Sequence, residues 1–192
     1  MKKFLLCSLP FILLISFINP AKTTAQESLS NNEEVFQYLQ EAFQAQVQLS
    51  EKPRTMEEIY EILSPYFSKE AMKVFTSENL FMEDGKYITY GTDFPIYYIP
   101  FFTYTDETKI VRKKGYIYVF EYFKDSGEGP VSFDDHYEGV IMKDIDGIYK
   151  VDEYLYDNIP EEIIQRSQQP NGSFSPVSIF LTNLFYMKKF FL

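Results

Sequence analysis

The chain has 192 residues, of which 45% are hydrophobic, and a formal net charge of −10. This length fits one domain with appendages, and the apolar content is sufficient for a single core. An acidic surface repels phosphate groups, which argues against nucleic acid as a partner and against adsorption to anionic lipid. This charge favours solubility, and it could also attract cations or basic partners.

Residues 1–25 have the pattern of a secretory signal peptide. Lys2 and Lys3 form a charged start, a mostly apolar run follows, and small residues precede a predicted cleavage after Ala25. Cleavage would remove Cys7, the only cysteine, and leave no thiol for a disulfide, a nucleophile or a metal site. Retention of the segment as a membrane anchor is the alternative.

The first half of the remaining chain is predicted to be helical. Residues 30–33 and 55–58 each form a capping box, in which a Ser or Thr side chain and a Glu side chain bond each other's backbone amides. Apolar residues recur at spacings of three and four after the first box and predict a helix over residues 31–49. The second helix ends at Pro65, and Ser68 opens a third. The apolar face of the third helix is expected at Met72, Val74 and Phe75.

Strand-forming residues dominate the second half. The predicted strands are residues 87–90, 109–112, 116–123, 136–145 and 148–156. Residues 116–123 are apolar on both faces, with Glu121 as the only charge, so both faces should be covered by other layers. The dipeptide Asp146-Gly147 suits the type I′ turn of a hairpin. A short helix is expected to start at residues 159–162, with its proline in the first turn.

Residues 91–110 form an unusual segment rich in proline and aromatic residues. Its prolines cannot donate ladder hydrogen bonds, so it is expected to lie extended over the helices or along a sheet edge. Exposed aromatic residues there would line a groove for a peptide, a glycan or a lipid. The candidate ligand-binding residues are Asp93, Tyr97, Tyr98 and Tyr104. The alternative is that these residues cover the open side of the sheet as part of the core.

His136, the only histidine, is the best candidate for catalysis. On a strand, Asp134, His136 and Glu138 would share one face, and a carboxylate beside an imidazole suits acid–base chemistry. The same three side chains are a possible metal site, although their spacing is common by chance. The remaining alternative is a solvated strand start without a special role.

No metal or cofactor is predicted. Residues 142–153 partly match a calcium-binding loop through Asp144, Asp146, Gly147 and Glu153. The first ligand position is Met142, however, and the flanking residues favour strands rather than helices. A hairpin turn accounts for this stretch.

The predicted organisation is a signal peptide over residues 1–25, a single domain over residues 26–167, and a linker with an apolar tail over residues 168–192. The tail from Val177 is out of character with the acidic domain and too short to span a bilayer. It either lies in a membrane interface or has no native role. Membrane contact is thus expected only through the signal segment or this tail.

Helices followed by an antiparallel sheet predict the α+β class. This order, with the closing hairpin pattern at residues 139–154, resembles the nuclear transport factor 2-like superfamily. That resemblance implies a cone in which N-terminal helices fill the concave side of a curved sheet. It implies no particular activity, because the fold carries enzymes and binding proteins alike.

A second resemblance is to a family of small secreted proteins of unknown function from Gram-positive bacilli. The residues that carry it are 62–75, 87–110 and 118–123, and the resemblance extends over residues 36–156. It implies a secreted single domain and supplies no activity.

Three functions are therefore open. The first is a secreted or envelope-associated, non-enzymatic domain that binds an extracellular ligand or protein. The second is a small cone-fold enzyme that uses His136 with Asp134 or Glu138 as acid and base. The third is a surface protein anchored by its apolar ends.

Overall fold

The computed structural model describes residues 29–91, 96–125 and 134–168. These residues form four α-helices, one short 3-10 helix and two antiparallel sheets, which confirms the α+β class. The predicted signal peptide and the apolar tail lie outside the described residues. The elements are α1 (Asn32–Val47), η1 (Gln48–Ser50), α2 (Met56–Leu63), α3 (Lys69–Asn79), β1 (Leu80–Glu83), β2 (Lys86–Thr89), β3 (Lys109–Lys113), β4 (Tyr116–Phe123), β5 (His136–Ile145), β6 (Ile148–Tyr156) and α4 (Glu161–Ser167).

The helix starts follow the predicted capping chemistry with one shift. At α2, the Glu58 amide donates to Thr55 Oγ1 over 3.3 Å and the Thr55 amide donates to Glu58 Oε2 over 2.7 Å, as predicted. At α1, the cap is Asn31 rather than Ser30, and Glu34 closes the box. The Asn31 carboxamide accepts from the Glu34 amide through its oxygen and donates to the Glu34 carboxylate through its nitrogen.

Two details of the other helices differ from the sequence prediction. Val74 of α3 is 39% exposed, and the buried residues of that helix are Ala71, Met72, Phe75 and Asn79. Pro160 is the N-cap of α4 and precedes its first turn. Strand β1 was not predicted, because its sequence of Leu, Phe, Met and Glu contains no residue that marks the end of α3.

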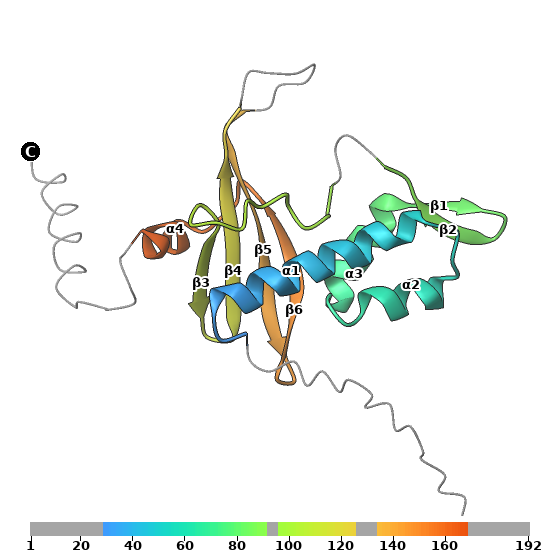
Figure 1. Cartoon of the computed structure of the whole chain (residues 1–192), viewed down its shortest axis with the longest axis horizontal. Coiled ribbons are helices and arrows are strands. Elements are labelled where there is room, and N and C mark those ends of the chain that lie inside the picture. Colours follow the sequence, from blue (N-terminus) through green and yellow to red (C-terminus); the bar gives the residue numbers. More distant parts are fainter. Residues whose placement is uncertain (1–28, 92–95, 126–133, 169–192) are drawn as a thin grey trace, which may run out of the picture.

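Strands β3 to β6 form an antiparallel meander in chain order, and β1 and β2 form a separate hairpin. Asp146 and Gly147 have φ values of 56° and 85°, which confirms the predicted turn with positive φ at both positions. Figure 1 shows the β1–β2 hairpin and α4 at opposite ends of the molecule. The outer edge of β2 pairs with Arg54 through two 2.8 Å backbone hydrogen bonds.

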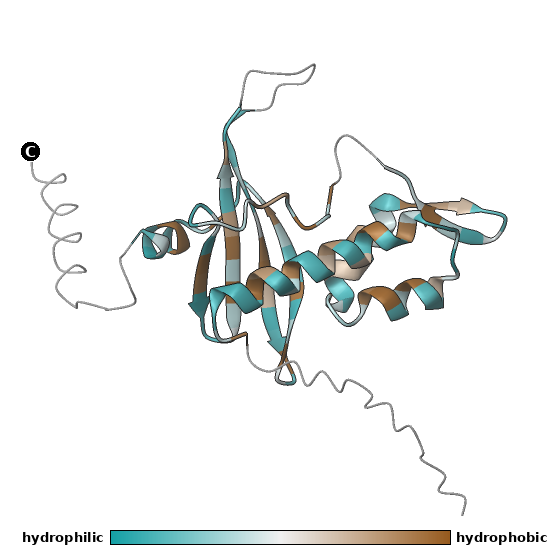
Figure 2. Ribbon diagram, viewed as in Figure 1, coloured by the Kyte–Doolittle hydropathy of each residue, from teal (hydrophilic) through white to brown (hydrophobic). Residues whose placement is uncertain are grey.

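Both faces of β4 are covered, as predicted. Ile117 and Val119 belong to the larger core, which the sheet forms with α1, α2 and α3. Phe120 lies on the other face and belongs to a smaller core with Ile159 and Ile163 at α4. Helix α1 carries alternating hydrophobic and hydrophilic stretches in Figure 2, as an amphipathic helix across a sheet requires.

The segment of residues 96–108 contains no helix or strand, yet parts of it are deeply buried. Its backbone polar groups are bonded by side chains. The fully buried Gln46 of α1 accepts from the Ile99 amide at 2.9 Å and donates to the Tyr97 carbonyl at 2.8 Å. The side-chain amide of Gln46 thus supplies the hydrogen bonds that a neighbouring strand would otherwise give to this backbone.

Glu121 makes the second attachment of the same segment. It is 5% exposed, and its Oε2 accepts from the Thr103 amide at 2.9 Å and from the Thr108 hydroxyl at 2.7 Å. Burial and the negative charge of Glu121 raise the pKa of nearby Tyr104 to about 12. The single charge predicted on β4 therefore holds the loop onto the sheet.

Replacement of Gln46 by leucine tests this attachment. Gln46→Leu keeps the apolar stem and leaves the Ile99 amide and the Tyr97 carbonyl without partners in the core, so we expect a loss of about 2–4 kcal/mol in the free energy of unfolding. Urea denaturation followed by circular dichroism measures it. Gln44→Leu, at an exposed position of the same helix, is the control and should change stability by less than about 0.5 kcal/mol. Equal losses of unfolding free energy in Gln46→Leu and Gln44→Leu would contradict the role of Gln46 in holding this segment.

Candidate functional site

The four predicted ligand-binding residues do not gather in one groove among the described residues. Tyr98 is 9% exposed and packs edge-on against Phe75 of α3, with 5.0 Å between ring centroids. Tyr104 is half-buried and packs against α1 and Phe102. Tyr97 is also half-buried, and Asp93 lies outside the described residues.

Tyr98 nevertheless reaches a hollow of about 180 Å³ at the end of α1, which we call the aromatic hollow. Its lining includes Phe101, which is 65% exposed and whose ring lies 5.5 Å from the ring of Phe43. Phe101, Tyr90 and Val47 are all exposed here, and exposed apolar residues that lie together are a feature of binding surfaces. The hollow is lined by Phe43, Val47, Ser50, Tyr90, Gly91, Tyr98 and Phe101.

The β1–β2 hairpin extends this apolar surface. The ring of Phe81 on β1 lies 5.2 Å from the ring of Tyr90, and Phe81 is 52% exposed. The Tyr90 hydroxyl donates to Glu83, which holds the ring against the hairpin. This hydrogen bond, more than burial or the charge of Glu83, raises the pKa of Tyr90. The hydroxyl therefore stays neutral and remains a donor.

The outer edge of β1 is open. Met82 lies opposite Tyr87, whose amide and carbonyl point away from β1 toward Arg54. Two residues directly opposite each other in an antiparallel pair either both bond the partner strand or both point away from it. The amide and carbonyl of Met82 therefore also point away from β2. Neither group has a hydrogen-bond partner within residues 29–91, 96–125 and 134–168, and the Met82 side chain is 67% exposed.

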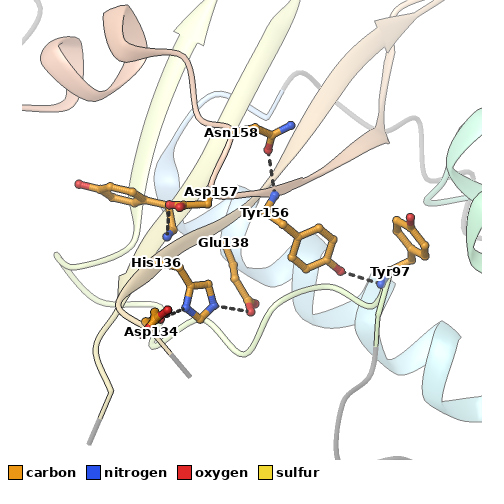
Figure 3. A network of polar contacts seen from close by, with 8 residues as sticks. Tyr97, Asp134, His136, Glu138, Tyr156, Asp157 and Asn158 are labelled. Carbon is orange, nitrogen blue, oxygen red and sulfur yellow. Dashed lines mark hydrogen bonds and ion pairs between the residues drawn. The ribbon is translucent and has the colours of Figure 1, made fainter. Parts of the chain in front are cut away.

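His136 lies in a different place, at the start of β5. Figure 3 shows its ring between two acceptors: Nδ1 is 2.7 Å from the carbonyl oxygen of Asp134, and Nε2 is 3.0 Å from Glu138 Oε1. The ring also stacks on Phe123, at 6.0 Å between centroids. Asp134 precedes the strand and contributes its backbone, so the predicted pairing with a carboxylate is made by Glu138.

The pKa of His136 reflects opposing effects. Burial lowers it, but the hydrogen bonds to Glu138 and to the Asp134 carbonyl, together with the charges of Glu138 and Asp157, raise it above its usual value. The ring is therefore more readily protonated than a free histidine, and when protonated it forms an ion pair with Glu138. A protonated ring is a poorer general base than a neutral one.

A tyrosine cluster lies beside this pair. The Tyr97 amide donates to the Tyr156 hydroxyl at 2.7 Å, and the Tyr156 amide donates to Asn158 (Figure 3). Burial raises the pKa of Tyr154 and of Tyr156, so both hydroxyls stay neutral. His136 and Glu138 do not line the aromatic hollow, and they do not line the open groove between α1 and α2.

Within the part of the chain that the structure describes, no three His, Cys, Asp or Glu side chains are arranged to hold a metal ion. Asp144, which matched a calcium-loop position, instead accepts from the Gly147 amide at 2.7 Å in the hairpin turn. None of the helices in the described ranges is long and apolar enough to cross a membrane.

The sequence did not identify the lining residues Phe43, Val47 and Phe101, because segments far apart in the sequence bring them together. Phe43 and Val47 follow the same helical spacing as the core residues of α1, and Phe101 resembles its buried neighbours in composition. The one signal for this site was the density of aromatic residues beside Pro95 and Pro100.

Residues 31–123 match the model of a family described as "Protein of unknown function (DUF3993)". The predicted resemblance to a domain of unknown function is thereby confirmed, and the match ends with β4 rather than at Tyr156. No curated protein and no solved structure matches the chain. Every residue that lines the aromatic hollow lies within the matched range, whereas His136 and Glu138 lie outside it.

Replacement of Glu138 by glutamine should lower the pKa of His136, because it removes the charge and weakens the hydrogen bond that raise it. The raised pKa means that protonated His136 adds stability below pH of about 6.5, and that this contribution is lost as pH rises through the folded-state pKa. Glu138→Gln should flatten that part of the stability profile.

An NMR titration of the imidazole protons measures this pKa, and the chain has only one histidine to assign. Glu153→Gln, at an exposed position of β6, is the matched control. An unchanged His136 pKa in Glu138→Gln would show that the ion pair does not exist in solution.

Proposed function

We propose that the protein is an exported, non-enzymatic binding domain that holds an extended apolar segment of a partner protein in the aromatic hollow. The observation that carries this proposal is the contact between Phe81 of β1 and Tyr90, which lines the hollow, on a strand whose outer edge is open. Phe81 is exposed, as is Phe101 at the hollow, and the backbone groups of Met82, the next residue on β1, point to solvent. Together these groups offer both contacts that an added strand needs.

The mode of binding is strand addition. The partner segment pairs with the outer edge of β1, so that its backbone bonds the amide and carbonyl of Met82. Alternate side chains of an added strand point to the same face, and one apolar side chain then enters the aromatic hollow. Main-chain bonds supply affinity in this mode, and the hollow selects the side chain.

A comparison with β3, an edge strand of the four-stranded sheet, supports the choice of β1. Strand β3 carries Lys109, Arg112 and Lys113, and charged side chains of this kind discourage edge-to-edge pairing. Strand β1 has no lysine, arginine or proline and exposes Phe81 and Met82 instead. An edge of this composition is suited to accept a strand.

Export rests on the sequence of residues 1–25, which has the charged start, the apolar run and the small residues of a signal peptide. We place the mature protein outside the cell or in the cell envelope, after cleavage behind Ala25. Mass spectrometry of the exported product tests this cleavage. A product that begins at Met1 would instead favour the anchored form.

We also propose that the fold is a variant of the nuclear transport factor 2-like cone. The order of elements supports this, because α1, α2 and α3 precede the four-stranded sheet and share a core with one of its faces. The aromatic hollow would then lie at the rim of the cone, where the irregular segment meets α1.

Acid–base catalysis is the second candidate function, and the 3.0 Å contact between His136 Nε2 and Glu138 Oε1 favours it. A catalytic role would require a substrate to reach this pair beside Tyr97 and Tyr156. We prefer binding, because the pair does not line the aromatic hollow and lies outside the family match.

A capped seven-residue peptide of alternating threonine and valine, with phenylalanine at its centre, tests strand addition. It should shift the NMR signals of the Met82 amide and of the Phe101 ring. Met82→Pro removes the outward amide from an edge position that tolerates proline, and should weaken binding at least tenfold. Phe101→Ala should weaken it by a similar factor through lost apolar contact.

Tyr116→Ala, at an exposed aromatic residue of β4, is the control and should bind the peptide like the unmodified protein. A peptide with lysine at its centre should bind more weakly than the phenylalanine peptide. Peptide binding that is unchanged by Met82→Pro and by Phe101→Ala would overturn the proposal.

A further inference from the structure

A second concave surface lies on the other side of α1, between this helix and α2. It is an open groove of about 570 Å³, within the usual range of ligand sites. One wall is formed by four exposed glutamines, three from α1 and one from the adjoining η1, and the other includes Ile62 and Tyr66. The glutamines are Gln37, Gln40, Gln44 and Gln48.

The side-chain amides of Gln40, Gln44 and Gln48 are available to a ligand. No hydrogen bond to another described residue engages them, whereas Gln37 donates to Glu41 at 3.0 Å. The Tyr66 hydroxyl contacts the same Glu41 carboxylate at 3.4 Å. This contact holds Tyr66 at the groove and leaves the three free amides in a row along the helix.

The side chains that line the groove favour an uncharged ligand over an ion. A carboxamide is uncharged and both donates and accepts hydrogen bonds, which matches a hydroxyl group in each respect. Glu41 is the only charged residue in the lining, and together with the net charge of −10 it disfavours an anion. A single carboxylate that already accepts two hydrogen bonds is also a poor site for a metal cation.

We propose that this groove binds a neutral oligosaccharide, through Gln40, Gln44 and Gln48 to its hydroxyl groups and through Tyr66 to the apolar face of a sugar ring. Successive glutamines four residues apart are about 6 Å apart along the helix axis, which is similar to the length of one sugar unit. The carboxamide groups of the groove are therefore spaced like the successive sugar units of a linear glycan. Ile62 and Ala45 supply the apolar floor.

This site is independent of the aromatic hollow. The two surfaces share no lining residue, and the partner chemistry differs, since the hollow takes an apolar side chain. A failure of peptide binding at β1 would leave the oligosaccharide proposal intact, and the reverse also holds.

Titration with chitotetraose and cellotetraose, followed by NMR of the glutamine side-chain amides and the Tyr66 ring, tests the inference. At millimolar concentration one of these sugars should shift the signals of Gln40, Gln44 and Tyr66 and leave the Met82 amide unchanged. The double variant Gln40→Ala and Gln44→Ala should raise the dissociation constant about tenfold, because it removes two neutral hydrogen-bonding groups.

Gln165→Ala, at an exposed glutamine of α4, is the matched control and should bind like the unmodified protein. Both variants exchange exposed helical residues for alanine, the best helix former, so they should remain folded. The absence of shifts with either sugar, equal binding by the double variant, or shifts of these glutamines by the capped peptide alone would each overturn the inference.

Discussion

The structure depends on how the irregular segment of residues 96–108 satisfies its buried backbone. This segment includes Pro100 and joins no sheet, yet Tyr98, Ile99 and Phe102 are in the core. A buried amide without a partner costs about as much as a lost hydrogen bond. Two side chains remove that cost, since Gln46 bonds the segment near Ile99 and Glu121 bonds it near Thr103.

These attachments determine what the surface can do. Gln46 holds the chain close to α1, so that Tyr98 faces inward while Phe101 faces outward over Phe43. The aromatic hollow is a consequence, because its walls come from α1, from the end of β2 and from this segment. The His136 pair, by contrast, depends on β5 and on the chain just before it.

Local chemistry made much of the fold predictable. Thr55 and Glu58 cap α2, Ser68 caps α3, and Asp146-Gly147 turns the last hairpin, because each effect acts within four residues. The shift from Ser30 to Asn31 shows the limit, since two adjacent residues offered competing caps. Fold class followed from the order of these elements.

The sites were harder to predict, because their geometry comes from contacts distant in sequence. Gln46 was one glutamine among several on an amphipathic helix, and its partners lie more than fifty residues away. Glu121 seemed an isolated charge on an apolar strand, although it bonds Thr103 and Thr108. The sequence offered Asp134 and Glu138 equally as partners of His136. In the structure the side-chain partner is Glu138, because Asp134 precedes β5 and contributes its carbonyl oxygen.

Native-state hydrogen exchange of the Ile99 and Thr103 amides tests the central claim most directly. If Gln46 and Glu121 hold the segment in the core, both amides should exchange as slowly as the paired amides of Val119 and Val140 in the sheet, through global unfolding. Exchange of Ile99 and Thr103 at the rates of an open loop, with the sheet amides still protected, would contradict this account.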